Sequence, residues 1–346
     1  MSSAIVQTVP LGARWPTLDP FLFCAHHLDR YPAGDGALAP AAPLAGRSIG
    51  ADFAGIDGWN MYHGSTVPGF PQHPHRGFET VTYVRRGWCD HSDSLGAQAR
   101  FGEGDVQWVT AGTGIVHSEM FPLFDTEGPN TLHLFQIWLN LPAASKMVDP
   151  YFSMLWHGDI PVVTEGGAEV TVIAGSLGSV EALPPPPDSW AAADSDVAIW
   201  HVRLQGDGSW TLPPAAGGAS RVLYLFEGPT AVEGRELGAD TGVVIDPTVP
   251  VELRGGAGGS EALLLQGRPI GEPVAQYGPF VLNDEAGIRQ AMLDYQRTGF
   301  GGWPWPTDDP VHGPDPERFA RYGDGTMVKP DGAVRPHRRA ATPSSG

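Results

Sequence analysis

The sequence predicts an all-β protein that folds as two β-barrels in one chain, with a few short helices. Its length of 346 residues is too great for one small domain and suits two. Short apolar runs alternate with turn residues, including 46 glycines and 34 prolines, a pattern typical of many strands joined by turns. A hydrophobic content of 41% gives the chain enough apolar surface to bury and disfavours disorder.

The first half contains three runs with the character of strands. Residues 79–84 (ETVTYV) are rich in β-branched and aromatic side chains and are followed by a turn at Gly87. Residues 105–110 (DVQWVT) follow Gly104 and stop before another glycine turn. Residues 132–141 alternate along a longer strand, which places on one face Leu132, Leu134, Gln136, Trp138 and Asn140.

A second series of strands is predicted in the other half, at residues 169–175, 198–204, 221–226 and 261–265. The four consecutive prolines at 184–187 suit an exposed connection. Since the two series look alike and the seam falls within 142–165, we expect one barrel over residues 1–145 and a second over 146–300.

One helix is predicted near residues 284–298. Asn283 can cap it, Asp284 and Glu285 place negative charge in its first turn, and Gly299 ends it. After residue 301 the chain becomes rich in Pro, Gly and Asp and loses periodicity. Residues 301–346 are therefore expected to form a loosely ordered tail.

Charge and cysteine content exclude several classes of protein. A formal net charge of −18 repels phosphates and disfavours direct nucleic-acid binding, apart from a basic cluster around Arg338. Cys24 and Cys89 are too few for a disulfide framework or a thiolate zinc site. No run approaches the roughly 18 apolar residues of a membrane span, and the first residues lack a signal-peptide core. A cytoplasmic protein without membrane contact is expected.

Two pairs of metal-ligating residues stand out: His73 with His75, and His117 with Glu119. On a strand, residues i and i+2 point to the same face, roughly 7 Å apart, so each pair can converge on one ion. Two pairs on neighbouring strands would supply three nitrogens and one oxygen and leave coordination positions open, a pattern typical of non-haem Fe(II) sites. A lone His-x-His is more often surface or turn chemistry, and the combination of pairs is what favours a metal site.

The segments around these pairs resemble the pirins, a branch of the cupin superfamily. One motif is 73–82 (HPHRGFETVT), and its partner is 104–120 (GDVQWVTAGTGIVHSEM). Two later segments agree in order, 136–142 (QIWLNLP) and 272–283 (EPVAQYGPFVLN). The resemblance therefore spans roughly residues 15–300.

This resemblance implies two jelly-roll-like cupin barrels, with a metal site in the first formed by His73, His75, His117 and Glu119. Glu79 matches a ligand position of ordinary cupins, and in pirins it is expected beside the metal and outside the ligand set. Thr113 departs from the arginine that pirins commonly carry there. Because residues 161–300 contain a single histidine, His201, the second barrel is expected to lack a metal site and to cover the first.

Other residues are candidates for the pocket around the metal. Phe70, Trp108 and Phe121 are candidates to wall it and exclude water, although each is more often a plain core residue. His63 and His91 are candidates for the pocket mouth, where a lone histidine is more often a hydrogen-bonded structural residue.

The resemblance implies an Fe(II) dioxygenase that acts on a flavonol such as quercetin with O₂, with one iron per chain and Glu119 as ligand and base. The same ligands would accept Mn, Ni, Co, Cu or Zn. The alternative is a non-catalytic, iron-dependent regulator that binds a protein partner, either a transcription factor or a metabolic enzyme. A metal-binding isomerase or epimerase is a third class, which no residue favours. The volume of the cavity near the metal discriminates between the dioxygenase and the regulator, because a flavonol needs several hundred Å³ and a regulator does not.

Overall fold

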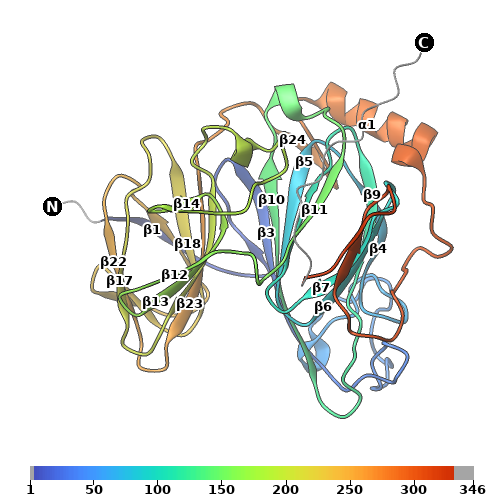
Figure 1. Cartoon of the computed structure of the whole chain (residues 1–346), viewed down its shortest axis with the longest axis horizontal. Helices are drawn as coiled ribbons and strands as arrows, with labels where there is room; N and C mark the ends of the chain where they lie inside the picture. The colour runs from blue at the N-terminus through green and yellow to red at the C-terminus, as the bar shows by residue number, and fades with distance from the viewer. Residues whose placement is uncertain (1–3, 331–346) are drawn as a thin grey trace.

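The computed structural model describes residues 4–330 and confirms the predicted all-β architecture. Two strand-rich barrels lie side by side. The one α-helix of the described residues, α1 (Glu285–Thr298), runs along the outside of one of them (Figure 1). The predicted helix is therefore present, and Asp284 is its N-cap in place of Asn283. Within residues 4–330, no helix combines the length and apolar character needed to cross a bilayer.

The first barrel consists of two six-stranded sheets. In hydrogen-bonded order, one sheet contains β11 (Tyr151–Leu155), β8 (Val106–Thr110), β5 (Phe78–Arg86), β10 (Asn130–Asn140), β3 (Phe21–Tyr31) and β2 (Arg14–Trp15). The other contains β27 (Met327–Val328), β26 (Phe319–Arg321), β7 (Gln98–Gly102), β6 (Trp88–Asp93), β9 (Ile115–Met120) and β4 (Gly69–His75).

The second barrel pairs a seven-stranded sheet with a four-stranded one. The larger contains β1 (Ile5–Pro10), β21 (Thr241–Ile245), β18 (Ser220–Glu227), β23 (Ser260–Gly267), β16 (Ala198–Leu204), β13 (Ala168–Ala174) and β12 (Val162–Glu165). The smaller contains β17 (Ser209–Leu212), β22 (Val251–Gly255), β19 (Thr230–Val232) and β20 (Arg235–Leu237). The remaining elements are two hairpins and four short 3₁₀ turns: β14 (Ser176–Leu177) with β15 (Val180–Glu181), β24 (Ala275–Tyr277) with β25 (Phe280–Leu282), and Ile56–Gly58, Ala143–Ser145, Trp190–Ala192 and Gly299–Gly301.

The terminal strands cross to the opposite barrels, so the expected boundaries are wrong in three places. β1, near the N-terminus, pairs with β21 of the second barrel, while β26, near the C-terminus, pairs with β7 of the first (Figure 1). β11 pairs with β8, which places the seam after Leu155 and not at residue 145. The tail expected from residue 301 contains two paired strands; its part beyond 330, including Arg335, His337, Arg338 and Arg339, lies outside the described residues.

The sheet that contains β5 and β10 is covered on both faces. Side chains such as Val81, Tyr83 and Ile137 pack with Ile199 and Leu263 of the second barrel in one buried cluster. The opposite face of the same sheet lines the interior of the first barrel, where Leu132 and Leu134 belong to a separate cluster. Because side chains alternate along a strand, every second residue of β5 and β10 faces the second barrel. The residues between them face the interior of the first barrel.

Polar contacts join the barrels as well. His201 on β16 lies between the Tyr83 hydroxyl, 3.0 Å from its Nδ1, and the Glu261 carboxylate, 2.7 Å from its Nε2. Glu261 also pairs with Arg85 of the first barrel. The only histidine of residues 161–300 thus has both ring nitrogens occupied by the contact between barrels.

A buried ion pair anchors the C-terminal segment to the first barrel. Arg100 on β7 donates through Nε and Nη2 to the two carboxylate oxygens of Asp90 on β6, at 2.7 and 2.6 Å. Arg100 also donates to the Asp315 carbonyl, and Asp90 accepts the backbone N–H of His312. The side chains of Arg100 and Asp90 are both buried. The charge of each is therefore neutralised by the other and not by water.

Replacement of Arg100 should therefore be costly. Arg100→Met leaves Asp90 buried without its cation and is expected to lower the free energy of unfolding in urea by about 3–5 kcal/mol. Arg254→Met is the matched control, because Arg254 pairs with Asp207 at 4.0 Å on the surface, where such a pair contributes about 0–1 kcal/mol. Equal small effects for both variants would contradict this interpretation.

Candidate metal centre

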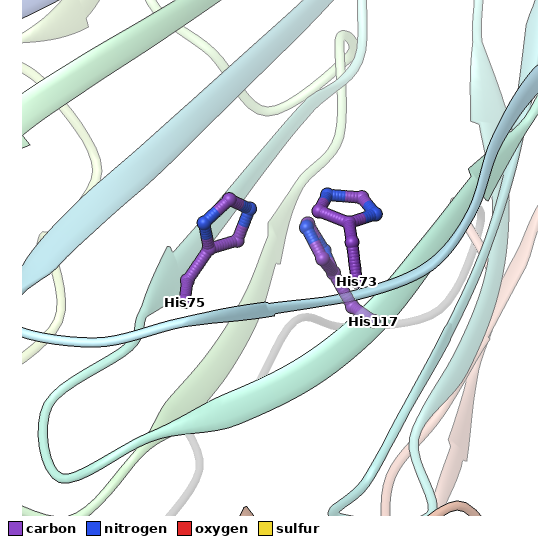
Figure 2. A group of neighbouring side chains, drawn as sticks. All are labelled: His73, His75 and His117. Atoms are coloured by element: carbon purple, nitrogen blue, oxygen red, sulfur yellow. The ribbon is translucent and has the colours of Figure 1, made fainter. Parts of the chain in front are cut away.

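The centre is built by two antiparallel strands, β4 and β9. Their register places His73 opposite His117, and a bulge between Phe70 and His73 interrupts the regular pairing. Bulges re-aim the side chains that follow them, and here the following residues are His73 and His75. All three imidazoles project to the same side of the strands (Figure 2), and one ring nitrogen from each lies within 4.8 Å of the others. The predicted convergence of these three histidines is confirmed.

The hydrogen bonding of the three rings leaves nitrogens free for a ligand. His73 Nδ1 lies 2.8 Å from the Pro71 carbonyl, which requires Nδ1–H and leaves the Nε2 lone pair available. Within residues 4–330, neither ring nitrogen of buried His117 has a hydrogen-bond partner, and nor does His75 Nδ1. Buried polar atoms are normally paired, so these orphaned nitrogens fit a cation that they would coordinate.

Burial also sets the protonation state of the cluster. Desolvation lowers the pKa of His73 to about 4, and it holds the pKa values of His75 and His117 well below the usual range. The nearby histidines oppose a positive charge further. Neutral imidazoles result, and this is the form that binds a metal ion.

Glu119, the fourth predicted ligand, lies on β9 two residues after His117 but outside the three-histidine cluster. Its carboxylate accepts hydrogen bonds from Thr82 Oγ1 at 2.9 Å and from Gln136 Nε2 at 3.1 Å. Burial raises the pKa of Glu119, while these two donors act in the opposite direction. Its role as a ligand requires the carboxylate to turn from Thr82 and Gln136 toward the imidazoles, and it remains a prediction.

The cluster opens on a cavity of about 850 Å³. His73, His75 and Glu119 line it together with Phe70 and Phe121, as predicted for both phenylalanines. The remaining wall is largely aromatic and apolar, and includes Phe23, Phe53, Tyr62, Leu134 and Trp138. This size and this lining are typical of sites that enclose a small organic ligand.

Two residues expected at this pocket lie elsewhere. Glu79 accepts hydrogen bonds from Thr110 Oγ1 at 2.7 Å and from Ser189 of the second barrel, and burial raises its pKa to about 7. Trp108 belongs to the apolar cluster between the barrels. The expectation that Glu79 lies beside the metal is therefore wrong, and Trp108 is the core residue that was its more common alternative. Both side chains occupy the face of their sheet that meets the second barrel, opposite the cavity.

The two histidines expected at the pocket mouth differ. His63 is exposed, with Nδ1 2.7 Å from the Gly50 carbonyl and its ring beside Phe53 and Phe70, at the rim of the cavity but outside its lining. His91 is fully buried behind His117, at 5.5 Å between ring centroids, and its Nε2 contacts Asp93. His91 is therefore not at the pocket mouth; it is a hydrogen-bonded structural residue beside the cluster, the alternative that a lone histidine more often represents.

Several residues in the cavity or next to its lining were not predicted. Thr82 and Gln136 orient Glu119, and Trp138 packs against His75 with ring centroids 5.5 Å apart. The alternation of residues 132–141 gave a usable signal, since a glutamine lies between leucine and tryptophan on one face. His27 and Tyr62 also line the cavity, but they belong to no motif.

Comparisons with known proteins agree with this architecture. The pirin family profile matches residues 50–139, and the profile of the pirin C-terminal cupin domain matches residues 199–301. Pirin-1 of Arabidopsis thaliana is 39% identical over 243 residues, 68% of this chain and 80% of its own length. A Pseudomonas aeruginosa protein provisionally named quercetin 2,3-dioxygenase is 38% identical over 235 residues, 66% of this chain and 79% of its own. The crystal structure of quercetin 2,3-dioxygenase from Acinetobacter baumannii superimposes with a TM-score of 0.70 at 25% identity, covering 87% of this chain and 99% of that one.

Loss of one imidazole should abolish metal binding. His117→Ala removes the ring whose two nitrogens lack partners, and we expect bound metal to fall from about one ion per chain to near zero, measured by elemental analysis after reconstitution. His63→Ala is the control, since its ring is bonded to backbone at the rim, and it should retain the metal. Full metal content in His117→Ala would contradict the site.

Proposed function

The chain belongs to the pirin family, and from this premise and the geometry of the cavity we propose that it is a metal-dependent dioxygenase acting on a flavonol such as quercetin. The observation that carries the proposal is the cluster of three neutral histidines opening on a cavity of about 850 Å³. The name of the Acinetobacter baumannii structure supports the same substrate class.

Cavity size favours catalysis over a purely regulatory role. A flavonol needs several hundred Å³, and a sensor that uses the metal only to set local charge needs no such space. The aromatic rings of Phe70, Phe121 and Trp138 offer flat apolar surface to a planar ligand. These side chains would also exclude water from the reacting atoms.

We propose one Fe(II) per chain, held by His73, His75 and His117, with Glu119 as the fourth ligand. Orphaned buried nitrogens and neutral imidazoles fit a divalent transition metal. When bound, such an ion supplies Lewis acidity that lowers the pKa of a coordinated hydroxyl group.

Glu119 is proposed as the proton acceptor for the substrate hydroxyl. It lines the cavity with His73 and His75, and it would act as the base when its carboxylate is off the metal, in the position where Thr82 and Gln136 donate to it. Burial raises its pKa, which makes it a stronger base than an exposed carboxylate. The proton would pass from the substrate oxygen to a Glu119 oxygen and leave the substrate as its anion.

Oxygen consumption tests the proposed reaction. Protein stripped of metal and reloaded anaerobically with Fe(II) should consume O₂ when quercetin is added. His75→Ala should show none, because it lacks a proposed ligand and a cavity wall residue. No uptake by protein that carries one equivalent of iron would overturn the dioxygenase and favour the iron-dependent regulator.

Substitution of Glu119 tests the proposed base. Glu119→Gln keeps the size of the side chain and removes the basic oxygen, and kcat with quercetin should fall by about 100-fold or more. Steady-state kinetics on samples matched for metal content make the measurement. Glu236→Gln, on an exposed strand of the second barrel, should leave kcat unchanged, and an unchanged kcat in Glu119→Gln would assign the base elsewhere.

A further inference from the structure

A second polar cluster, separate from the three histidines, lines the same cavity. It consists of His27 and Asp29 on β3 with Asn60 and Tyr62 from the loop before β4, and all four residues line the same cavity as His73. His27 and Asp29 are two residues apart on a strand, so they share its inner face. Neither the proposed metal site nor the proposed base makes use of this cluster.

Hydrogen bonds link the cluster into a chain that ends at His27. Asp29 Oδ1 accepts from the backbone and side-chain nitrogens of Asn60, at 2.9 and 3.0 Å. Asp29 Oδ2 accepts from the Tyr62 hydroxyl at 2.6 Å, and that hydroxyl lies 2.7 Å from His27 Nδ1. Within residues 4–330, His27 Nε2 has no hydrogen-bond partner, and the one hydrogen bond of this ring is through Nδ1.

The direction of these bonds follows from charge. Burial raises the pKa of Asp29 to about 6, so the carboxylate is still ionised at neutral pH and can only accept. The Tyr62 hydroxyl must then donate its one hydrogen bond to Asp29, and His27 must donate from Nδ1–H to the Tyr62 oxygen. Burial lowers the pKa of His27 to about 4, so the ring is neutral and Nε2 carries a lone pair.

The backbone of Tyr62 is an independent sign that this arrangement is imposed. Tyr62 has a φ of 56°, in the left-handed region that a bulky aromatic residue rarely adopts. Two backbone hydrogen bonds with Asp52, at 2.8 and 2.9 Å, hold it there. Such strain persists where surrounding structure enforces it, and it is concentrated at functional sites.

We propose that His27 determines ligand specificity, with Nε2 accepting a hydrogen bond from a phenolic hydroxyl that lies away from the three-histidine cluster. This inference rests on the proposed function and deepens it: the preferred ligand is a polyhydroxylated aromatic molecule that is anchored at both ends. Asp29 and Tyr62 act as positioning residues, because they fix the tautomer in which Nε2 is the acceptor.

The Phe70 ring contacts both anchors and sets an upper limit on the distance between them. The Phe70 ring lies 6.0 Å from the His27 ring and 6.3 Å from the His73 ring, between centroids. The two imidazoles are thus no more than about 12 Å apart. Because this limit does not exceed the length of a flavonol, we expect one ligand to reach both the histidine cluster and His27.

The test compares binding of two flavonols to iron-loaded protein without oxygen. Quercetin carries four hydroxyls besides the one at position 3, and 3-hydroxyflavone carries none. Wild-type protein should bind quercetin more tightly than 3-hydroxyflavone. His27→Phe should lower the ratio of the Kd for 3-hydroxyflavone to the Kd for quercetin by about tenfold. Tyr62→Phe should lower this ratio less. The variant keeps His27 but removes the hydroxyl that holds the proton on its Nδ1. His63→Phe, which changes a ring beside the same Phe70, should leave the ratio unchanged.

A preference that survives in His27→Phe would overturn the inference while leaving the dioxygenase intact. Tight binding without oxygen consumption would instead remove the proposed reaction, and the Kd ratio would still decide the role of His27. Binding of neither flavonol would overturn both. Long-range ¹H–¹⁵N NMR of zinc-loaded wild-type protein reads the tautomer without any substitution: Nδ1–H is expected, and Nε2–H would refute the proposed acceptor.

Discussion

The antiparallel pairing of β4 with β9 is the constraint on which the centre depends. It sets His73 opposite His117, and the two-residue period of the strand brings His75 to the same side. Burial by the surrounding barrel then removes water from the rings, keeps them neutral and leaves both nitrogens of His117 and Nδ1 of His75 without protein partners. Geometry and protonation state therefore have a common origin in one pair of strands.

The sheet of β5 and β10 connects this centre to the rest of the molecule. One face supplies Gln136 and Trp138 to the cavity and Thr82 to the Glu119 carboxylate. The other supplies Val81 and Tyr83 to the apolar cluster shared with the second barrel. The second barrel thus supports the cavity from behind. Since the single histidine of residues 161–300, His201, is engaged with Tyr83 and Glu261, its contribution is to packing.

Local patterns in the sequence were sufficient for the two barrels, the helix and the three clustered histidines, because strand periodicity and helix caps act over a few residues. They were insufficient for Glu79 and Trp108, whose positions depend on which face of a sheet meets the other barrel. His27, Asp29 and Tyr62 form a chain only through contacts more than thirty residues apart, and no spacing rule reveals such contacts. The same holds for β1 and β26, whose partners lie far along the chain.

The exchange of terminal strands has a consequence for synthesis on the ribosome. The seven-stranded sheet of the second barrel needs β1, which is made first, and β21, which is made after some two hundred and thirty further residues. The first barrel receives β26 and its neighbour β27 only after every other strand of the described chain has been made. Domains often fold one after another as they emerge, but here neither barrel can be completed until most of the chain has left the exit tunnel. Until then, the unpaired edges of both sheets need protection from other nascent chains.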